Sequence, residues 1–172
     1  MNSERVDIAV IGAGPAGAAT AIRAARSGAR VVVFEKGAHG RDKVCGDGLT
    51  PRAVGALDEL KIPLDDAHHI RGLRMIAGKQ VRELDWPTTD RFPNHGAAWP
   101  SRRLDAALMD AAAHAGAELV YETEATPIID AGRVTGVVAA GRVVEADLTV
   151  VAAGAQGAVA RMLGAERVPD EP

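Results

Sequence analysis

The chain has 172 residues, an apolar content of 47% and a formal net charge of −3, which fits one domain with a substantial core and excludes nucleic acid as the expected partner. Its single cysteine excludes an internal disulfide framework and fits a reducing compartment. Because the sequence has a polar N-terminus and no run of about 20 apolar residues, it predicts neither a signal peptide nor a membrane span, and we expect a cytoplasmic protein that contacts membranes only peripherally.

The chain begins with a predicted strand, helix and second strand. The apolar run Val6–Ile11 predicts the first strand, the alanine-rich run Ala16–Arg26 the helix, and the apolar run Arg30–Phe34 a strand that ends at Glu35. The turn between the first strand and the helix carries a G-x-G-x-x-G motif, formed by Gly12, Gly14 and Gly17. Strand, glycine turn, helix and closing acid together indicate a dinucleotide-binding βαβ unit.

Each part of this motif has a physical role. Gly12 allows a tight turn, Gly14 lets a pyrophosphate approach the backbone, and Gly17 lets the helix pack close to the strand. The helix N-terminus, with Pro15 in its first turn, favours an anion. Glu35 can accept hydrogen bonds from ribose hydroxyls and would repel a 2′-phosphate. The alternative is a glycine-rich turn in an ordinary βαβ unit, but the spacing of all the parts favours dinucleotide binding.

Farther along, the sequence predicts a helix and a hairpin. Thr50 is a suitable N-cap, Pro51 suits the first helical position, and the helix runs to about Leu60. The pattern over Arg71–Asp85 predicts a β-hairpin that turns at Gly78–Lys79.

The second half of the chain is predicted to consist mainly of short strands. Three prolines make residues 86–100 a loop or an edge strand, and the spacing of apolar residues over Leu104–Ala115 predicts a helix. Short strands are predicted over residues 117–121, 128–129, 134–139, 143–144 and 148–152. A β-meander after the first βαβ unit is typical of FAD-binding rather than NAD-binding domains. We therefore expect an α/β, Rossmann-like FAD-binding domain with a parallel sheet, a crossover β-meander and inserted antiparallel strands over residues 1–167, followed by a polar tail over residues 168–172.

The stretch Lys43–Leu49, with the sequence K-V-C-G-D-G-L, resembles the geranylgeranyl reductase family of FAD-dependent oxidoreductases. The resemblance covers nearly the whole chain and is closest to the branch acting on prenyl chains of quinones and other polyprenyl lipids. It implies that reduced FAD saturates isoprenoid C=C bonds of a geranylgeranyl or prenyl-quinone lipid. It also implies NAD(P)H as the electron donor and transient contact with a membrane surface.

The same resemblance assigns residues to the site. It places Cys45 and Gly46 beside the flavin and makes Cys45 the candidate catalytic residue, which shapes or protonates the reaction site; the alternative for Cys45 is a small buried filler. Arg102 either replaces a family arginine that is Ser101 here or is a solvated charge. No metal site is expected, because the His68–His69 pair has no partner ligands at a suitable spacing. The expected cofactor-binding residues are Gly12, Ala13, Gly14, Pro15, Ala16, Gly17, Glu35, Lys36, Cys45, Gly46, Asp47, Gly48, Arg102 and Ala125.

The chain also departs from the family. Ala153 and Gly157 stand where the family has an acid and a serine, and the later Gly-Asp motif and substrate-binding sheet are absent from this sequence. We therefore expect the N-terminal part of a larger flavoprotein, with a C-terminal complementing segment as a partner and weak FAD binding by this chain alone. The alternatives are an FAD-dependent aromatic monooxygenase, whose first domain has the same architecture, and a non-catalytic dinucleotide-binding fragment.

Overall fold

The computed structural model describes residues 4–41, 45–154 and 157–165. The chain divides into two compact units, one formed by residues 1–41 and 108–172 and the other by residues 42–107. The predicted tail over residues 168–172 lies outside the described residues, and the prediction of one FAD-binding domain over residues 1–167 stays a prediction.

The first unit is built on a six-stranded sheet in the order β8-β2-β1-β11-β10-β9. Strands β8, β2, β1 and β11 run parallel, whereas β10 is antiparallel to both β11 and β9. The strands are β1 (Glu4–Ile11), β2 (Val31–Phe34), β8 (Glu118–Val120), β9 (Ala125–Asp130), β10 (Arg133–Ala139) and β11 (Arg142–Val151). The predicted Rossmann-like α/β fold with a crossover β-meander is thereby confirmed.

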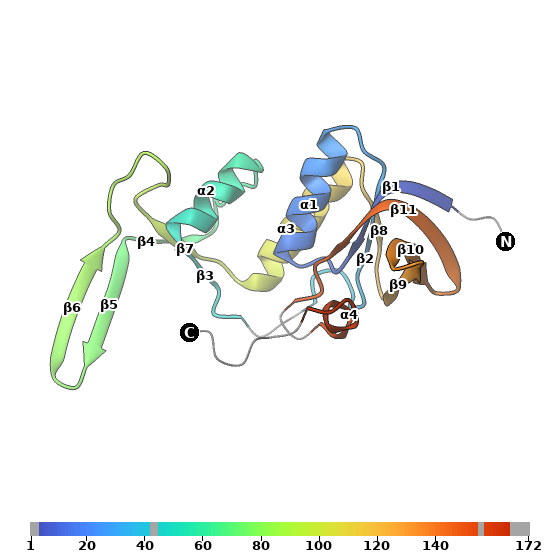
Figure 1. Ribbon diagram of the computed structural model, residues 1–172. Helices are drawn as coiled ribbons and strands as arrows, with labels where there is room; N and C mark the ends of the chain where they lie inside the picture. Colours follow the sequence, from blue (N-terminus) through green and yellow to red (C-terminus); the bar gives the residue numbers. More distant parts are fainter. Residues whose placement is uncertain (1–3, 42–44, 155–156, 166–172) are drawn as a thin grey trace. The chain divides into compact units, whose positions relative to one another are not determined.

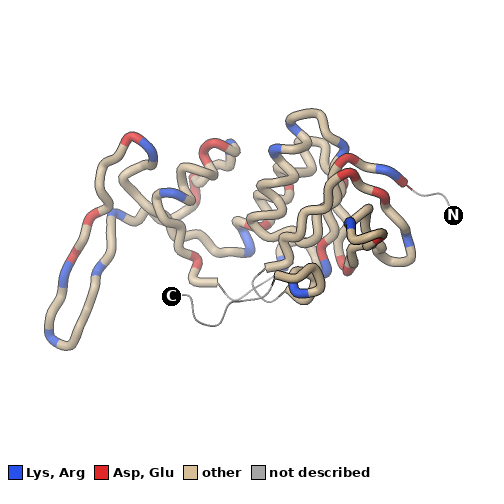
Figure 2. The backbone as a smooth tube through the Cα atoms, viewed as in Figure 1, with Lys and Arg blue, Asp and Glu red and all other residues tan. Residues whose placement is uncertain are grey.

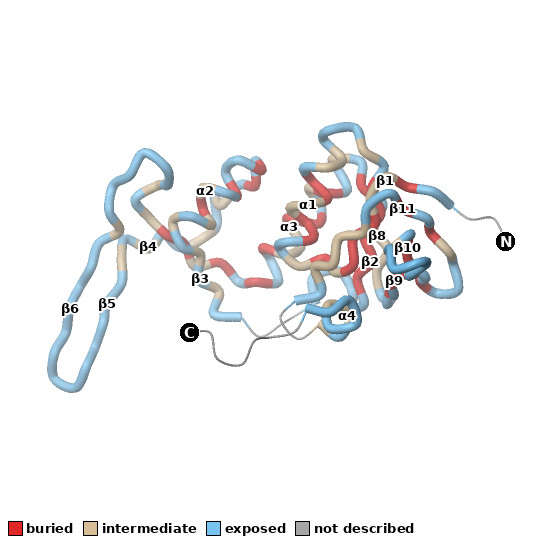
Figure 3. Tube along the Cα trace, in the orientation of Figure 1, coloured by how far each residue is buried: buried red, intermediate tan, exposed pale blue. Residues whose placement is uncertain are grey.

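Helix α1 (Pro15–Arg26) contacts β1 and β2, as Figure 1 shows. Its small residues let it lie close to the sheet, and Ala18, Ala21 and Ile22 have no exposed surface. Strand β2 is buried at all four of its positions, as expected of a central parallel strand (Figure 3). The core of this unit includes the interface between α1 and the parallel strands, and a cluster of buried residues from β1, β2, β9, β10 and β11.

The second unit contains a small sheet, a helix and a separate hairpin. The sheet has the order β3-β7-β4, in which both outer strands are antiparallel to β7. Thr50 caps the helix as predicted, since its Oγ1 accepts a hydrogen bond from the Ala53 amide at 3.4 Å. The elements are β3 (Gly48–Leu49), α2 (Pro51–Glu59), β4 (His68–Ile70), β5 (Gly72–Ala77), β6 (Gln80–Asp85) and β7 (Gly96–Ala98). Strands β5 and β6 form the predicted hairpin around Gly78–Lys79.

Helix α3 (Ser101–His114) begins in the second unit and ends in the first, and helix α4 (Ala158–Met162) follows β11. The sequence predicted α3 to begin at Leu104, but the helix begins directly after Pro100. The short helix α4 was not predicted.

Two strand predictions were wrong. Residues 143–144 and 148–152 were predicted as separate strands, but β11 runs unbroken from Arg142 to Val151 because β1 and β10 pair with it on either side. The segment 86–100 was predicted as a loop or an edge strand, yet β7 is the central strand of its sheet. Its prolines lie outside Gly96–Ala98, so no ladder hydrogen bond is lost to them.

Candidate nucleotide and flavin site

The glycine turn joins the carboxyl end of β1 to α1 and lies beside the end of β11. Gly12 has a φ of +100°, and a Cβ there would lie 2.6 Å from the carbonyl oxygen of Ala152. A Cβ at Gly17 would lie 1.9 Å from the carbonyl oxygen of Gly12. The fold itself therefore requires glycine at both positions, for the tight turn and for the close helix–strand packing that the sequence predicted.

Gly14 differs from the other two glycines of the motif. Its φ is −66°, and a Cβ there would meet nothing within 4 Å among the described residues. Gly14 is the N-cap of α1 and provides no side-chain cap, and Pro15 follows at the first helical position. The described residues thus leave space at Gly14 beside the N-terminus of α1, a position where an anion is favoured.

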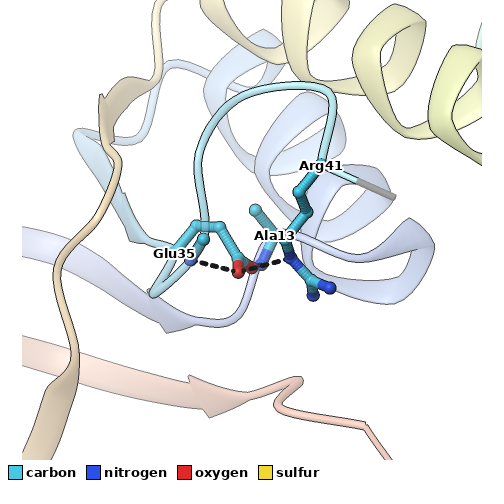
Figure 4. Close-up of polar contacts among 4 residues, drawn as sticks. Ala13, Glu35 and Arg41 are labelled. Atoms are coloured by element: carbon cyan, nitrogen blue, oxygen red, sulfur yellow. Dashed lines mark hydrogen bonds and ion pairs between the residues drawn. The ribbon is translucent and has the colours of Figure 1, made fainter. Parts of the chain in front are cut away.

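Glu35 lies at the end of β2 with 6% of its surface exposed. Its Oε2 accepts a hydrogen bond from the Ala13 amide at 2.9 Å, and its Oε1 accepts one from the Gly37 amide at 2.9 Å. Arg41 Nε also donates to Oε1 at 3.1 Å (Figure 4). The acid predicted to bind a ribose is therefore held in a fixed orientation by the glycine turn and by the loop after β2.

These contacts control the ionisation of Glu35. Burial by itself would raise the pKa of the carboxyl, but the amides of Ala13 and Gly37 and the charge of Arg41 outweigh it. The net result is a lowered pKa, so the carboxylate is ionised at neutral pH. An ionised carboxylate is an acceptor only, which is what two ribose hydroxyls require.

The loop after β2 also contacts helix α3, through Asp110, and the residue that follows β8, Tyr121. His39 Nε2 lies 3.1 Å from Asp110 Oδ1, and the His39 ring packs edge-on against Tyr121 at 5.3 Å. Burial and the charges of Asp110 and Glu35 raise the pKa of Tyr121. The Tyr121 hydroxyl is buried without a hydrogen-bond partner among the described residues.

The loop predicted to border the flavin lies in the second unit, where its Asp47 has a structural role. Asp47 has a φ of +53°, its carbonyl oxygen accepts from the Trp99 amide at 2.9 Å, and its Oδ1 accepts from the Ser101 amide at 2.8 Å. The Asp47 carboxylate thereby satisfies an amide at the start of α3. Lys43 and Val44, which belong to the same motif, lie outside the described residues.

Cys45 and Gly46 precede this anchor and are both exposed, so Cys45 is not the buried filler of the alternative interpretation. A Cβ at Gly46 would meet nothing within 4 Å, and one at Gly48 would meet only Gly46 at 3.7 Å. Neither glycine has a positive φ. As at Gly14, the fold gives no reason for glycine here.

The remaining predicted residues are placed as follows. Arg102 is exposed and has no ion-pair partner among the described residues, whereas the neighbouring Arg103 pairs with Asp66 at 2.6 Å. Lys36 is exposed, and Ala125 is buried at the start of β9. Pro15 and Ala16 are exposed in the first turn of α1.

The first unit thus holds Gly12 to Gly17, Glu35, Lys36 and Ala125, and the second holds Cys45 to Gly48 and Arg102. Sequence reasoning missed Arg41, although its charge six residues after Glu35 was a signal, and it missed Tyr121.

Comparison with known proteins decides the family. A family model described as FAD binding domain matches residues 5–171. The chain belongs to the FAD-binding domain family. This FAD-binding domain is 41% identical to a menaquinone reductase of Mycolicibacterium smegmatis over 95% of the chain and 41% of that protein. It is 31% identical to digeranylgeranylglycerophospholipid reductase 3 of Methanosphaera stadtmanae over 73% of the chain and 32% of that protein. The predicted resemblance to geranylgeranyl reductases is confirmed.

Solved structures agree with the fold. A flavoprotein/dehydrogenase from Cytophaga hutchinsonii superposes with a TM-score of 0.81 at 31% identity, over 94% of this FAD-binding domain and 42% of that chain. PqsL, a probable FAD-dependent monooxygenase from Pseudomonas aeruginosa, superposes with a TM-score of 0.79 at 22% identity, over 98% of this chain and 48% of that one. The second likeness shows the fold alone. The chain spans about two fifths of the length of the menaquinone reductase that it matches.

Among the described residues, none of the helices combines the length and the apolar character that crossing a membrane requires. The described residues also contain no group of three or more His, Cys, Asp or Glu side chains that could hold a metal ion.

Proposed function

We propose that this chain is the nucleotide-binding part of an FAD-dependent reductase that saturates isoprenoid C=C bonds of a geranylgeranyl or prenyl-quinone lipid. The observation that carries the proposal is the 41% identity to a menaquinone reductase across 95% of the chain. A relative named as a digeranylgeranylglycerophospholipid reductase supports an isoprenoid lipid as the substrate. Such a lipid implies transient contact with a membrane surface.

The residues of the first unit fit the ADP portion of FAD. The open space at Gly14 and the amides at the start of α1 suit a pyrophosphate. Glu35 is ionised, and its orientation is fixed. A carboxylate has about four acceptor sites, and three donors already occupy three of them, so one site remains for a ribose hydroxyl. A second hydroxyl would take the place of Arg41, which is the only one of the three donors on a flexible side chain.

The glycines give independent support for ligand binding. Against the described residues, four glycines have neither a positive φ nor a close contact that an added Cβ would make. These four are Gly14, Gly46, Gly48 and Gly55. Three of them lie in the segments predicted to contact FAD, where close approach of a ligand would explain a missing side chain.

Saturation of a C=C bond adds a hydride and a proton, and FAD reduced by NAD(P)H would supply the hydride. The chain's own contribution is to bind and orient: Glu35 and the α1 N-terminus hold the nucleotide, and Asp47 fixes the loop that presents Cys45. The exposed Cys45 thiol is the group that we propose shapes or protonates the reaction site.

The first experiment tests the cofactor. Purified chain titrated with FAD should quench flavin fluorescence. Gly14→Ala should weaken binding about tenfold with only a small loss of thermal stability, because the added side chain would meet the ligand and the fold loses only an N-cap preference there. Gly55→Ala is the matched control, since Gly55 also lacks a structural need for glycine but lies outside the predicted site. Equal affinity of Gly14→Ala and the original chain would contradict the proposed site.

The second experiment tests the reaction. The chain joined to the portion of the M. smegmatis enzyme outside the match would be incubated with FAD, NADPH and a geranylgeranyl lipid or menaquinone. Mass spectrometry should detect the gain of two hydrogens on the prenyl chain. A hydroxylated product would favour the monooxygenase, and FAD binding without any product would favour the non-catalytic fragment.

A further inference from the structure

Arg41 contacts the carboxylate to which the proposed function assigns the ribose. Its Nε donates to Glu35 Oε1 at 3.1 Å, and the Gly37 amide donates to the same oxygen at 2.9 Å. The Arg41 side chain is 40% exposed, whereas that of Glu35 is only 8% exposed. The pair therefore lies at the boundary between the interior and the solvent, with the arginine on the side that a ligand can reach.

The loop after β2 leaves room for this arginine. A Cβ at Gly37 would lie 2.0 Å from Arg41 Cδ and 2.6 Å from its Nε, so the space that a side chain would fill there is the space in which the arginine lies. Gly40 has a φ of +66°, and the Arg41 amide donates to the Ala38 carbonyl oxygen at 3.2 Å, which closes a turn. The backbone of the loop thus supports the contact between Arg41 and Glu35.

Arg41 also changes the charge of the ribose subsite. A lone carboxylate would repel a 2′-phosphate, but the guanidinium beside Glu35 makes the pair neutral overall. Basic and acidic residues are interspersed along the described chain, as Figure 2 shows, and the formal net charge is only −3. Because no broad field of one sign surrounds the site, the response of the subsite to a phosphate depends on this local pair.

The hydrogen-bonding capacity of the pair suits two kinds of ribose. A ribose with free 2′- and 3′-hydroxyls brings two donors, and Glu35 has one free acceptor site, so the second hydroxyl must displace Arg41. A ribose phosphorylated at its 2′ position brings only the 3′ donor, which fills the free site and leaves Arg41 in place. The contact with Glu35 uses one of the five N–H donors of the guanidinium, and those that remain suit phosphate oxygens.

We propose that Arg41 determines the ribose specificity of the nucleotide site, and that this site accepts a 2′-phosphorylated adenine dinucleotide as well as an unphosphorylated one. The inference rests on the proposed nucleotide-binding role of the first unit and concerns which nucleotides that unit takes. Each ligand gains one interaction that the other lacks, either a second hydroxyl on Glu35 or a phosphate on Arg41. The affinities of the chain for NAD⁺ and NADP⁺ should therefore lie within about fivefold of each other.

The experiment is isothermal titration calorimetry of the full chain, without FAD, against NAD⁺ and NADP⁺, which differ only in the 2′-phosphate. Arg41→Ala should weaken NADP⁺ binding about tenfold or more, because it removes a charged donor and leaves the charge of Glu35 uncompensated. NAD⁺ binding should stay unchanged or strengthen by up to about threefold, because no arginine has to be displaced. An arginine that only orients Glu35 would instead weaken both ligands in parallel. Saturating FAD should abolish binding of both dinucleotides.

Three further variants separate charge from position. Arg41→Lys keeps the charge without the planar fork and should bind NADP⁺ with an affinity between those of the original chain and Arg41→Ala. Gly37→Ala keeps the charge but moves the arginine off Glu35, and should weaken NADP⁺ relative to NAD⁺ by about threefold. These two variants carry the test if Arg41→Ala does not fold. Arg26→Gln is the control, because it removes an exposed charge at the last residue of α1, and should leave the ratio of the two affinities within about twofold.

Four results would overturn the proposal: NADP⁺ binding more than about thirtyfold weaker than NAD⁺ to the original chain, parallel changes for both ligands in the Arg41 variants, an equal effect of Arg26→Gln, or NADP⁺ binding that FAD does not displace. Absence of binding by either dinucleotide would overturn it as well. A chain that binds NAD⁺ and FAD but rejects NADP⁺ contradicts only this inference, since the proposed reductase requires no 2′-phosphate at this subsite. The measurement needs no catalytic activity, so its outcome is distinct from a failure to reduce a prenyl lipid.

Discussion

The six-stranded sheet buries its aliphatic side chains, whereas the β5–β6 hairpin exposes similar side chains to solvent. In β2, Val33 and Phe34 are 0% and 1% exposed, whereas Leu73 and Leu84 of the hairpin are each 50% exposed. Strand β2 has a parallel neighbour on each side and α1 across its face, whereas within the described part of the chain the hairpin strands pair only with each other. Burial of an aliphatic side chain is thus decided by the number of neighbouring elements and not by its own type.

The two regions also differ in where their hydrogen bonds and ion pairs lie. In the first unit the glycine turn, Glu35 and Arg41 form a connected set of hydrogen bonds inside one fold. In the hairpin the charged residues pair across the strands in solvent, where such pairs contribute little. The polar contacts of the first region lie inside one fold, whereas no element of the described residues covers the apolar side chains of the hairpin.

The largest expected effect comes from truncating a buried side chain of β2, and an exposed residue of the hairpin provides the comparison. Phe34→Ala should lower the free energy of unfolding by about 4 kcal/mol, because it leaves a cavity in a closed core. Leu84→Ala should change it by less than about 0.5 kcal/mol in the chain alone. Urea denaturation followed by circular dichroism measures both, and similar losses for the two variants would remove the contrast between the regions.

Next in size is the glycine that holds α1 against β1. Gly17→Ala places a Cβ against the Gly12 carbonyl oxygen, so the helix must move, and we expect a loss of about 3 kcal/mol in unfolding free energy. Gly14→Ala is the control and should lose less than about 1 kcal/mol, since its site is open and only the N-cap preference for glycine over alanine is lost. Thermal unfolding of both variants provides the test; an unaffected Gly17→Ala variant would show that the helix is not held there.

A smaller effect is expected at the anchor of the flavin loop. Asp47→Ala removes the acceptor for the Ser101 amide and should cost about 1 kcal/mol, comparable with loss of a helix N-cap. Asp47→Asn keeps an acceptor oxygen and should recover most of that loss. Amide exchange at Ser101 should accelerate in the alanine variant only, and equal acceleration in both variants would argue against capping by the carboxylate.

The smallest effect is a pH dependence at Glu35. Its pKa in the folded chain is lowered below the ordinary value of 4.5, so the folded state binds this proton less readily than the unfolded state does. The stability that the carboxylate contributes is present above the ordinary value and is lost as pH falls through the lowered pKa. The difference in unfolding free energy between the original chain and Glu35→Gln should therefore shrink from neutral pH down to about pH 3. A difference that stays constant over this range would mean that ionisation of Glu35 does not stabilise the fold.

Much of the fold could be predicted from local patterns in the sequence. Gly12, Gly17 and Glu35 marked the βαβ unit, Thr50 with Pro51 marked the start of α2, and Gly78–Lys79 marked the hairpin turn. The cap at Thr50, the turn at Gly78–Lys79 and the positive φ of Gly12 rest on backbone conformations or hydrogen bonds between residues close together in the chain.

What the tertiary structure alone decided depends on residues far apart in the chain. The polar interior of β11 did not reveal one continuous strand, because pairing with β1 and β10 overrides local preference. The sequence assigned Asp47 to the cofactor, and only the fold brings its carboxylate to Ser101, 54 positions away. The exposure of the hairpin's apolar side chains is likewise a result of packing. Local propensity determined which elements form, and the partners available in space determined what each side chain contacts.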